Sequence, residues 1–238
     1  MSVSWPVGMW KGTLPRMALT IAVSSLKGGV GKSTLCLNVA VALHAAGHRV
    51  LLVDADPQAT LVAWAARAAE LGHDGPPVVA MTGTTLRRDL ARVAEGFDVV
   101  IVDSPPRMAT EARAAMLAAD LVVLPVTPGA ADLWAARETV AVLEDARSLR
   151  PELRAVAVLN RADRTTLAKM AATAVADLGI EALDVTMAAR VTIGEATLAG
   201  QGAVTYAPTS EAARDVRRLT KAILGAVGSA LSTTTEAA

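Results

Sequence analysis

Short apolar runs alternate with longer amphipathic segments along most of the chain. The apolar runs are continuous, as in Leu19–Val23, and continuous runs are typical of strands buried on both faces of a parallel sheet. Strands are predicted at 19–23, 49–53, 78–81 and 99–102, with further strands beginning at 120, 154 and 181. Helices are predicted over 35–46, 59–71, 84–95, 130–149, 165–178 and 210–227. This alternation predicts an α/β fold with a doubly wound, mostly parallel sheet and helices on both faces.

The length of 238 residues and the mass of 24.4 kDa suit one such domain, placed at 17–228. Residues 1–16 have little periodicity and are expected to be a flexible N-terminal extension. Residues 229–238 are expected to be a polar C-terminal tail. No segment approaches the roughly 18 to 20 uninterrupted apolar residues that a membrane helix needs.

The first predicted strand runs into a glycine-rich stretch, Lys27-Gly28-Gly29-Val30-Gly31-Lys32-Ser33-Thr34, and a helix follows. A strand, a glycine-rich turn, a Lys-Ser pair and a helix are the context of a phosphate-binding P-loop. Glycines let successive backbone amides approach a triphosphate, and the helix N-terminus adds unpaired N–H groups. In such a loop Lys32 reaches the β- and γ-phosphates, and the Ser33 hydroxyl ligates Mg²⁺.

The stretch departs from the common P-loop pattern at two positions. Leu26 stands where the first glycine of that pattern belongs, and a second lysine, Lys27, precedes the glycine pair. K-G-G-V-G-K-S-T resembles the deviant Walker A motif of the ParA/MinD family of P-loop ATPases. The resemblance implies that Lys27 reaches across an ATP-sandwiched dimer to the phosphates of the partner.

Two acidic motifs follow predicted strands. Asp54-Ala-Asp56-Pro57-Gln58 resembles the second signature of the ParA group, and the resemblance implies that Asp56 orients the attacking water. Asp103-Ser-Pro-Pro106 ends a Walker B-like strand, so Asp103 is expected to hold Mg²⁺ together with Ser33. Strand carboxyl ends are also where open α/β sheets bind ligands.

The residues that contact the base of the nucleotide are assigned by resemblance alone. Asn160 ends a predicted strand where the family's asparagine hydrogen-bonds adenine, and Arg161 follows it. Val204-Thr-Tyr-Ala-Pro208 resembles a family segment whose proline packs against the base. The resemblance therefore implies ATP and Mg²⁺ as ligands, with Asn160, Arg161 and Pro208 completing the nucleotide site.

The formal net charge is 0, so any contact with DNA must come from a local basic patch. The last predicted helix separates an apolar face from a basic one. We expect non-specific DNA binding by the basic face, with Arg190 as a further contact. The apolar face holds Val216, Leu219, Ile223 and Val227, and the basic face holds Arg214, Arg217, Arg218 and Lys221.

The single cysteine, Cys36, rules out a disulfide within the chain and fits a reducing cytoplasm. We interpret it as a small core residue. One cysteine cannot supply the cluster of nitrogenase iron proteins or the zinc site of the tail-anchored-protein targeting ATPases.

In length and in its D-P-Q-to-Trp64 stretch, the chain resembles small ParF-like ParA proteins. This implies slow Mg²⁺-dependent ATP hydrolysis, an ATP-dependent homodimer, a ParB-like adaptor, and plasmid or chromosome partition at the nucleoid. Two alternatives are a nucleoid-based ATPase that positions a protein cargo and a MinD-like membrane-surface ATPase. The polar tail disfavours the membrane alternative. Asp56 argues against a binding module without hydrolysis, and no substrate pocket for an amide-ligase-type synthetase is identifiable.

Overall fold

The computed structural model describes residues 18–162 and 166–235, with side chains to Val227. Its centre is a seven-stranded sheet in the order β3-β2-β4-β1-β5-β6-β7, and every neighbouring pair is parallel. The predicted extension at 1–16 lies outside the described residues. The strands are β1 (Leu19–Val23), β2 (Val50–Asp54), β3 (Val78–Ala80), β4 (Val99–Asp103), β5 (Leu121–Val126), β6 (Arg154–Asn160) and β7 (Glu181–Met187).

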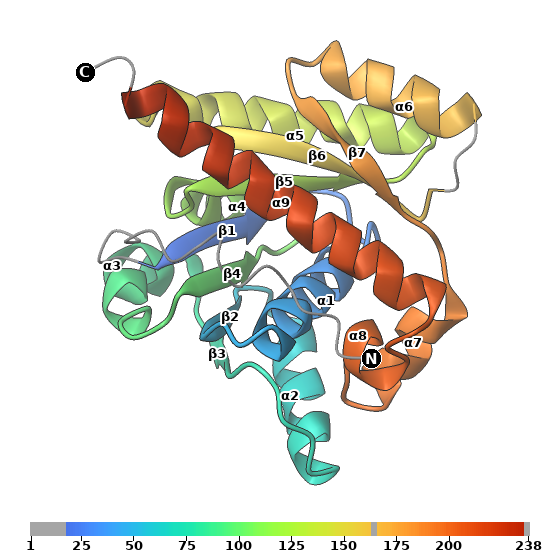
Figure 1. Ribbon diagram of the computed structural model, residues 1–238. Coiled ribbons are helices and arrows are strands. Elements are labelled where there is room, and N and C mark those ends of the chain that lie inside the picture. The colour runs from blue at the N-terminus through green and yellow to red at the C-terminus, as the bar shows by residue number, and fades with distance from the viewer. Residues whose placement is uncertain (1–17, 163–165, 236–238) are drawn as a thin grey trace.

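Helices cover both faces of this sheet, which confirms the predicted doubly wound α/β fold (Figure 1). One face packs against α1 (Lys32–Ala45), α2 (Thr60–Glu70), α7 (Val191–Leu198), α8 (Ala203–Tyr206) and α9 (Glu211–Thr235). The other packs against α3 (Gly83–Val93), α4 (Ala109–Leu117), α5 (Ala130–Leu149) and α6 (Thr166–Ala176). None of the helices in the described ranges combines the length and apolar character that crossing a bilayer would require.

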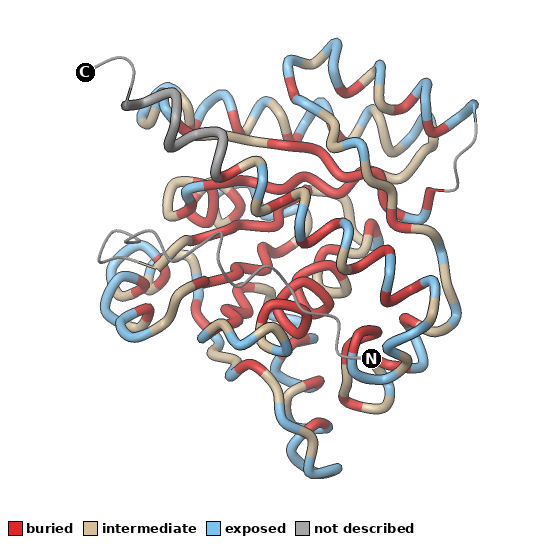
Figure 2. Tube along the Cα trace, viewed as in Figure 1, coloured by how far each residue is buried: buried red, intermediate tan, exposed pale blue. Residues whose placement is uncertain are grey.

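The central strands are apolar throughout because both of their faces are covered. In β4, Val99 and Ile101 join the core under α1 and α9, while Val100 and Val102 join the core under α3 to α5. Figure 2 shows the resulting buried sheet between helices whose outer surfaces are exposed. Cys36 is fully buried, so its interpretation as a core residue is confirmed, and Trp64 is also buried, at 5% exposed.

The structure differs from the sequence prediction at three places. Helix α4 was not predicted, because Ala112, Ala114 and Ala115 are all buried and leave no alternation of apolar and polar faces. Helices α7 and α8 are short and were not predicted as helices. Helix α9 continues to Thr235, beyond the predicted end near Val227 and into the segment predicted to be a polar tail.

Candidate nucleotide-binding site

The P-loop follows β1, the central strand, where the chain connections diverge to either side of the sheet. Crevices at such switch points are where open α/β sheets bind ligands. Gly29 and Gly31 have φ angles of 79° and 91°, and a residue with a Cβ adopts such angles only at a cost in free energy. A Cβ on Gly31 would also lie 2.3 Å from Nδ2 of Asn160. Glycine at these positions therefore allows the loop to close directly before α1.

Lys32, the first residue of α1, is only 6% exposed. Its Nζ donates a hydrogen bond to the carbonyl oxygen of Lys27 at 3.1 Å, so the ammonium lies inside the curve of the P-loop. Burial lowers the pKa of Lys32, while the nearby carboxylates of Asp103 and Asp56 act in the opposite direction. The geometry thus brings Lys32, Asp56 and Asp103 close enough to influence one another electrostatically, as the sequence motifs require.

Asp103 ends β4 with no exposed surface, and neither carboxylate oxygen has a hydrogen-bond partner in the described part of the chain. Burial raises its pKa to about 7, and the carboxylate of Asp54 adds to this rise, whereas Ser33, which approaches it, and Lys32 oppose it. A buried carboxylate without donors is costly unless a cation or a proton balances it. The pair of Asp103 and Ser33 therefore fits a hard divalent cation that takes its remaining ligands from water and phosphate oxygens.

The two aspartates after β2 have different environments. Asp54 is buried, and its Oδ2 accepts hydrogen bonds from the amides of Leu61 and Val62 at 2.9 and 3.1 Å, so it stabilises the N-terminal end of α2. Asp56 is partly exposed, and the one donor to its Oδ1 among the residues that the structure describes is the amide of Gln58, at 2.9 Å. Asp54 is therefore a structural carboxylate, and Asp56 keeps acceptor capacity for a water molecule.

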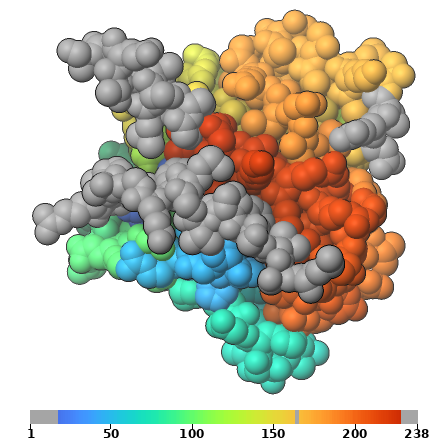
Figure 3. Space-filling view, viewed as in Figure 1, coloured from blue at the N-terminus to red at the C-terminus, as the bar shows by residue number. Residues whose placement is uncertain are grey.

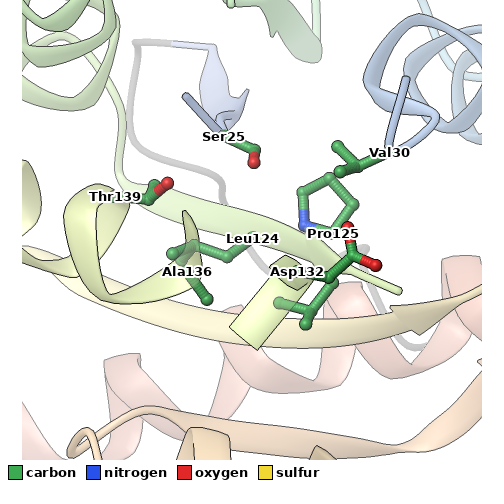
Figure 4. Close-up of a pocket in the computed structure, with 8 residues that line it drawn as sticks. Ser25, Val30, Leu124, Pro125, Asp132, Ala136 and Thr139 are labelled. Carbon is green, nitrogen blue, oxygen red and sulfur yellow. The ribbon is translucent and has the colours of Figure 1, made fainter. Parts of the chain in front are cut away.

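Lys27 lies at the rim of the loop, with its side chain 34% exposed, and it forms an ion pair with Asp132 in the first turn of α5. The same helix holds the preceding residue, because the amide of Leu26 donates to Oγ1 of Thr139 at 3.1 Å. Figure 4 shows Asp132 and Thr139 beside a small gap between the P-loop and α5, which Ser25, Val30, Leu124, Pro125 and Ala136 also line. The two lysines of the motif therefore occupy different places, one inside the loop and one on its edge.

A cavity of about 550 Å³ opens beside the P-loop, between the ends of β6 and β7 and helix α7. Asn160 and Arg161 line it, together with Gly31 and Thr34. Asn160 also donates from Nδ2 to the carbonyl of Val30 at 2.6 Å, which ties β6 to the loop. Pro208, the third residue predicted near the base, is exposed and does not line this cavity.

The predicted basic surface lies on α9, whose apolar face is buried as expected. Arg214, Arg218 and Lys221 are exposed, and Arg217 is half-buried. Arg214 forms an ion pair with Glu211, and Arg218 forms one with Asp215, so acidic neighbours offset part of the positive charge. The surface of α9, drawn in orange-red to red, forms part of the face seen in Figure 3.

Arg190, the further DNA contact that the sequence suggested, is not on α9 but pairs with two of its acidic residues, Glu211 and Asp215. It precedes α7, lines the cavity beside the P-loop, and donates from Nε to Oδ2 of the buried Asp215 at 2.7 Å. This interaction ties α7 to α9, which leaves Arg190 less available to an external ligand than Lys221.

Sequence reasoning missed three contributors to the site. Asp132 pairs with Lys27 over a separation of 105 residues, and Asp54 anchors α2. Met187, at the end of β7, lines the cavity. Only Asp54 carried a usable signal, since an aspartate shortly before a predicted helix is a common cap.

Comparison with known proteins agrees with this geometry. The sequence profile of the CobQ/CobB/MinD/ParA nucleotide binding domain matches residues 21–204. Maintenance of carboxysome distribution protein A of Halothiobacillus neapolitanus is 34% identical over 186 residues, which cover 77% of this chain and 85% of that protein. The chromosome-partitioning ATPase Soj of Thermus thermophilus is 31% identical over 238 aligned positions, which cover 87% and 96%. The fold matches septum site-determining protein MinD of Pyrococcus horikoshii, complexed with Mg-ADP, with a TM-score of 0.68, 22% identity and coverage of 86% and 95%.

Proposed function

Because the chain belongs to the CobQ/CobB/MinD/ParA nucleotide-binding family, we propose that it is a Mg²⁺-dependent ATPase that forms an ATP-sandwiched dimer. The observation that carries this proposal is the separation of the two motif lysines. Lys32 is buried inside its own loop, whereas Lys27 is partly exposed on the rim, where a second molecule can approach. A lysine needed only by its own nucleotide would have no reason to lie outside the loop.

The nucleotide is proposed to be ATP. Its phosphates would lie against the P-loop amides, and the base and ribose would lie in the cavity lined by Asn160 and Arg161. The MinD of similar fold was solved with Mg-ADP, which supports an adenine nucleotide and Mg²⁺. Asp103 and Ser33 would hold the metal ion, which when bound neutralises charge on the β- and γ-phosphate oxygens.

The side chains divide the hydrolysis reaction between them. Lys32 and the loop amides stabilise the negative charge that develops on the transferred phosphoryl group. Asp56, with a free acceptor oxygen, orients the attacking water in line with the phosphorus atom. Lys27 leaves Asp132 and approaches the phosphates of the partner, where it acts as an arginine finger does in other P-loop enzymes.

The dimer is the most direct test of this proposal. Sedimentation velocity should show a monomer with ADP and a dimer with a non-hydrolysable ATP analogue and Mg²⁺. A monomer at saturating analogue would contradict the sandwich dimer, and a dimer that forms equally well with ADP would contradict its dependence on ATP.

Asp56→Ala is expected to bind ATP and dimerise but to turn over about 10² to 10³ times more slowly, because a water-positioning carboxylate contributes to the transition state and little to ground-state binding. Single-turnover hydrolysis and fluorescent-nucleotide titration measure the two effects separately. Gln58→Ala is the matched control, since it alters the same turn without removing the carboxylate. A normal rate in Asp56→Ala would contradict the assignment.

The biological role that we propose is positioning of a cargo over the nucleoid in the cytoplasm. Partition of a plasmid or chromosome with a ParB-like adaptor is supported by the similarity to Soj. Positioning of a protein assembly is supported by the similarity to the carboxysome distribution protein, and it is the second candidate. The identity of the protein encoded beside this gene separates them, since a ParB-like DNA-binding adaptor fits only the first.

Non-specific DNA binding by the dimer is part of both roles. Neutralising the exposed basic residues of α9 in the triple variant Arg214→Gln, Arg218→Gln, Lys221→Gln should weaken ATP-dependent DNA binding at low salt by at least about tenfold, because phosphate contacts release counterions. Dimerisation should be retained. A mobility-shift titration measures this, and the control neutralises Arg87, Arg88 and Arg92 on α3. Equal DNA affinity in both triple variants would move the contact surface away from α9.

A further inference from the structure

Three residues other than glycine have a left-handed φ in the described part of the chain, and all three follow strands at the edge of the sheet that carries the P-loop. They are Ala59 after β2, Arg107 after β4 and Arg161 after β6, with φ angles of 52°, 59° and 52°. This conformation costs free energy for a residue with a Cβ, and glycine would remove the cost. Backbone strain of this kind concentrates at functional sites.

The turn at Arg107 is fixed against the beginning of the P-loop. Its amide donates a hydrogen bond to the carbonyl of Leu26 at 2.9 Å. Cβ of the preceding Pro106 lies 3.9 Å from the position that a Cβ on Gly28 would take. These contacts place the backbone of Arg107 beside the residue that precedes Lys27. They explain the shape of the turn but give no reason for an arginine there, since glycine would make the same backbone contacts.

The side chain of Arg107 is exposed and makes no ion pair with any described residue, whereas most arginines of this part of the chain do. Its neighbour at the rim, Lys27, is paired with Asp132. An exposed guanidinium without a carboxylate partner keeps its hydrogen-bond donors for a strongly negative group that reaches the rim of the loop. A polyphosphate has that charge, and the guanidinium fork matches its geometry.

We propose that Arg107 contacts the terminal phosphates of the nucleotide held by a second copy of the chain. This assignment rests on the proposed ATP-sandwiched dimer. The buried Lys32 already provides a cation on the inner side of each phosphate site. Arg107 lies on the exposed rim that the partner would cover. Arg107 and Lys27 then form a pair of cations that one subunit presents to the other.

Arg107→Gly removes the charge and the strain together, which separates the phosphate contact from a structural role. The unfolding midpoint should stay the same or rise, and ATP affinity of the monomer should change by less than about threefold. Turnover should fall by at least about tenfold, as for the loss of a cation at a transferred phosphoryl group, and Arg107→Lys should restore part of it. The control is Arg87→Ala, another exposed arginine without an ion pair, which should keep full turnover. Unchanged turnover in Arg107→Gly, or a lowered midpoint that accompanies the loss, would overturn the assignment.

Mixing the two impaired variants tests whether the contact crosses the interface. In a mixed dimer of Arg107→Gly with Asp56→Ala, the site of the first subunit has its own Asp56 and receives Arg107 from its partner. Equal mixing should restore about a quarter of the wild-type rate, because about half of the dimers are mixed and one of their two symmetric sites is complete. No recovery would overturn the contact across the interface.

The wild-type dimer serves as the reference for these experiments. If the wild type stays monomeric with the ATP analogue, both the proposed function and this inference fail. If it dimerises and hydrolyses ATP while Arg107→Gly matches it, only the inference fails.

Discussion

Lys27→Ala is expected to lower ATP turnover by about 10³-fold or more, while ATP binding to the monomer changes by less than about tenfold. The reason is the position of Lys27, which lies on the rim and bonds to Asp132, not inside the loop where Lys32 already lies. Steady-state hydrolysis and fluorescent-nucleotide titration measure the two quantities. An effect on turnover far larger than the effect on affinity identifies a group that acts in the transition state.

Two further variants make the result for Lys27 specific. Lys169→Ala removes an exposed lysine from α6 and should leave turnover unchanged. Asp132→Asn removes the carboxylate that pairs with Lys27 and leaves the ammonium of Lys27 in place. This variant should retain turnover within about tenfold of the wild type, since the ion pair is partly exposed and worth at most about 1 kcal/mol. If Lys27→Ala hydrolysed ATP normally, the transfer of the family's lysine role to this residue would be wrong.

Asp103→Asn is expected to abolish Mg²⁺-dependent hydrolysis and at the same time to stabilise the nucleotide-free protein. Burial raises the pKa of Asp103 to about 7, above its value of about 4 in the unfolded chain. At a pH between those two pKa values, the carboxyl group of Asp103 is protonated in the folded protein and ionised in the unfolded chain. The contribution of Asp103 to the free energy of unfolding therefore falls as the pH rises. Above about pH 7 the folded protein bears the full cost of an ionised carboxylate in its core. Asparagine does not ionise and avoids this cost.

The gain in the free energy of unfolding from Asp103→Asn should therefore be near zero below about pH 4, grow towards pH 7, and level at about 2 to 4 kcal/mol above it. Unfolding titrations with guanidinium chloride, in EDTA and across this pH range, measure this gain in stability. The matched control is Asp98→Asn, because the side-chain hydrogen bond from Arg49 lowers the pKa of Asp98. That variant should lose stability at neutral pH and recover it as the pH falls. A pH-independent gain in Asp103→Asn would contradict the cost of a buried charge.

The same carboxylate links stability to function in this fold. Both carboxylate oxygens of Asp103 are buried with little compensation from hydrogen-bond donors, as expected for a group proposed to face a cation. On the proposed assignment of Asp103 to Mg²⁺, the protein keeps in its core a carboxylate that asparagine is expected to replace with a gain in stability but without holding the metal ion. Proteins commonly retain such local costs at functional sites.

The sequence by itself determined the strands, most of the helices and the phosphate loop. Continuous apolar runs predict buried parallel strands, and a glycine-rich turn between a strand and a helix predicts its own backbone shape, because these features depend on neighbours along the chain. Asp56 and Asp103 were proposed for the same reason, since Asp103 is the last residue of β4 and Asp56 lies two residues after the end of β2. Helix α4 was missed because it is short and rich in alanine, so the contrast between its apolar and polar positions is weak.

Only the tertiary structure decided how these parts meet. The ion pair of Lys27 with Asp132 joins residues 105 positions apart, and the hydrogen bond of Asn160 to Val30 joins residues 130 positions apart. Both depend on β5 and β6 lying on one side of β1 while β4 and β2 lie on the other, an order that local periodicity does not encode. The left-handed turn at Arg107 likewise exists because β4 ends beside β1, which brings its amide to the carbonyl of Leu26. Local patterns fix the conformation of each segment, whereas the order of the strands sets which side chains share the site.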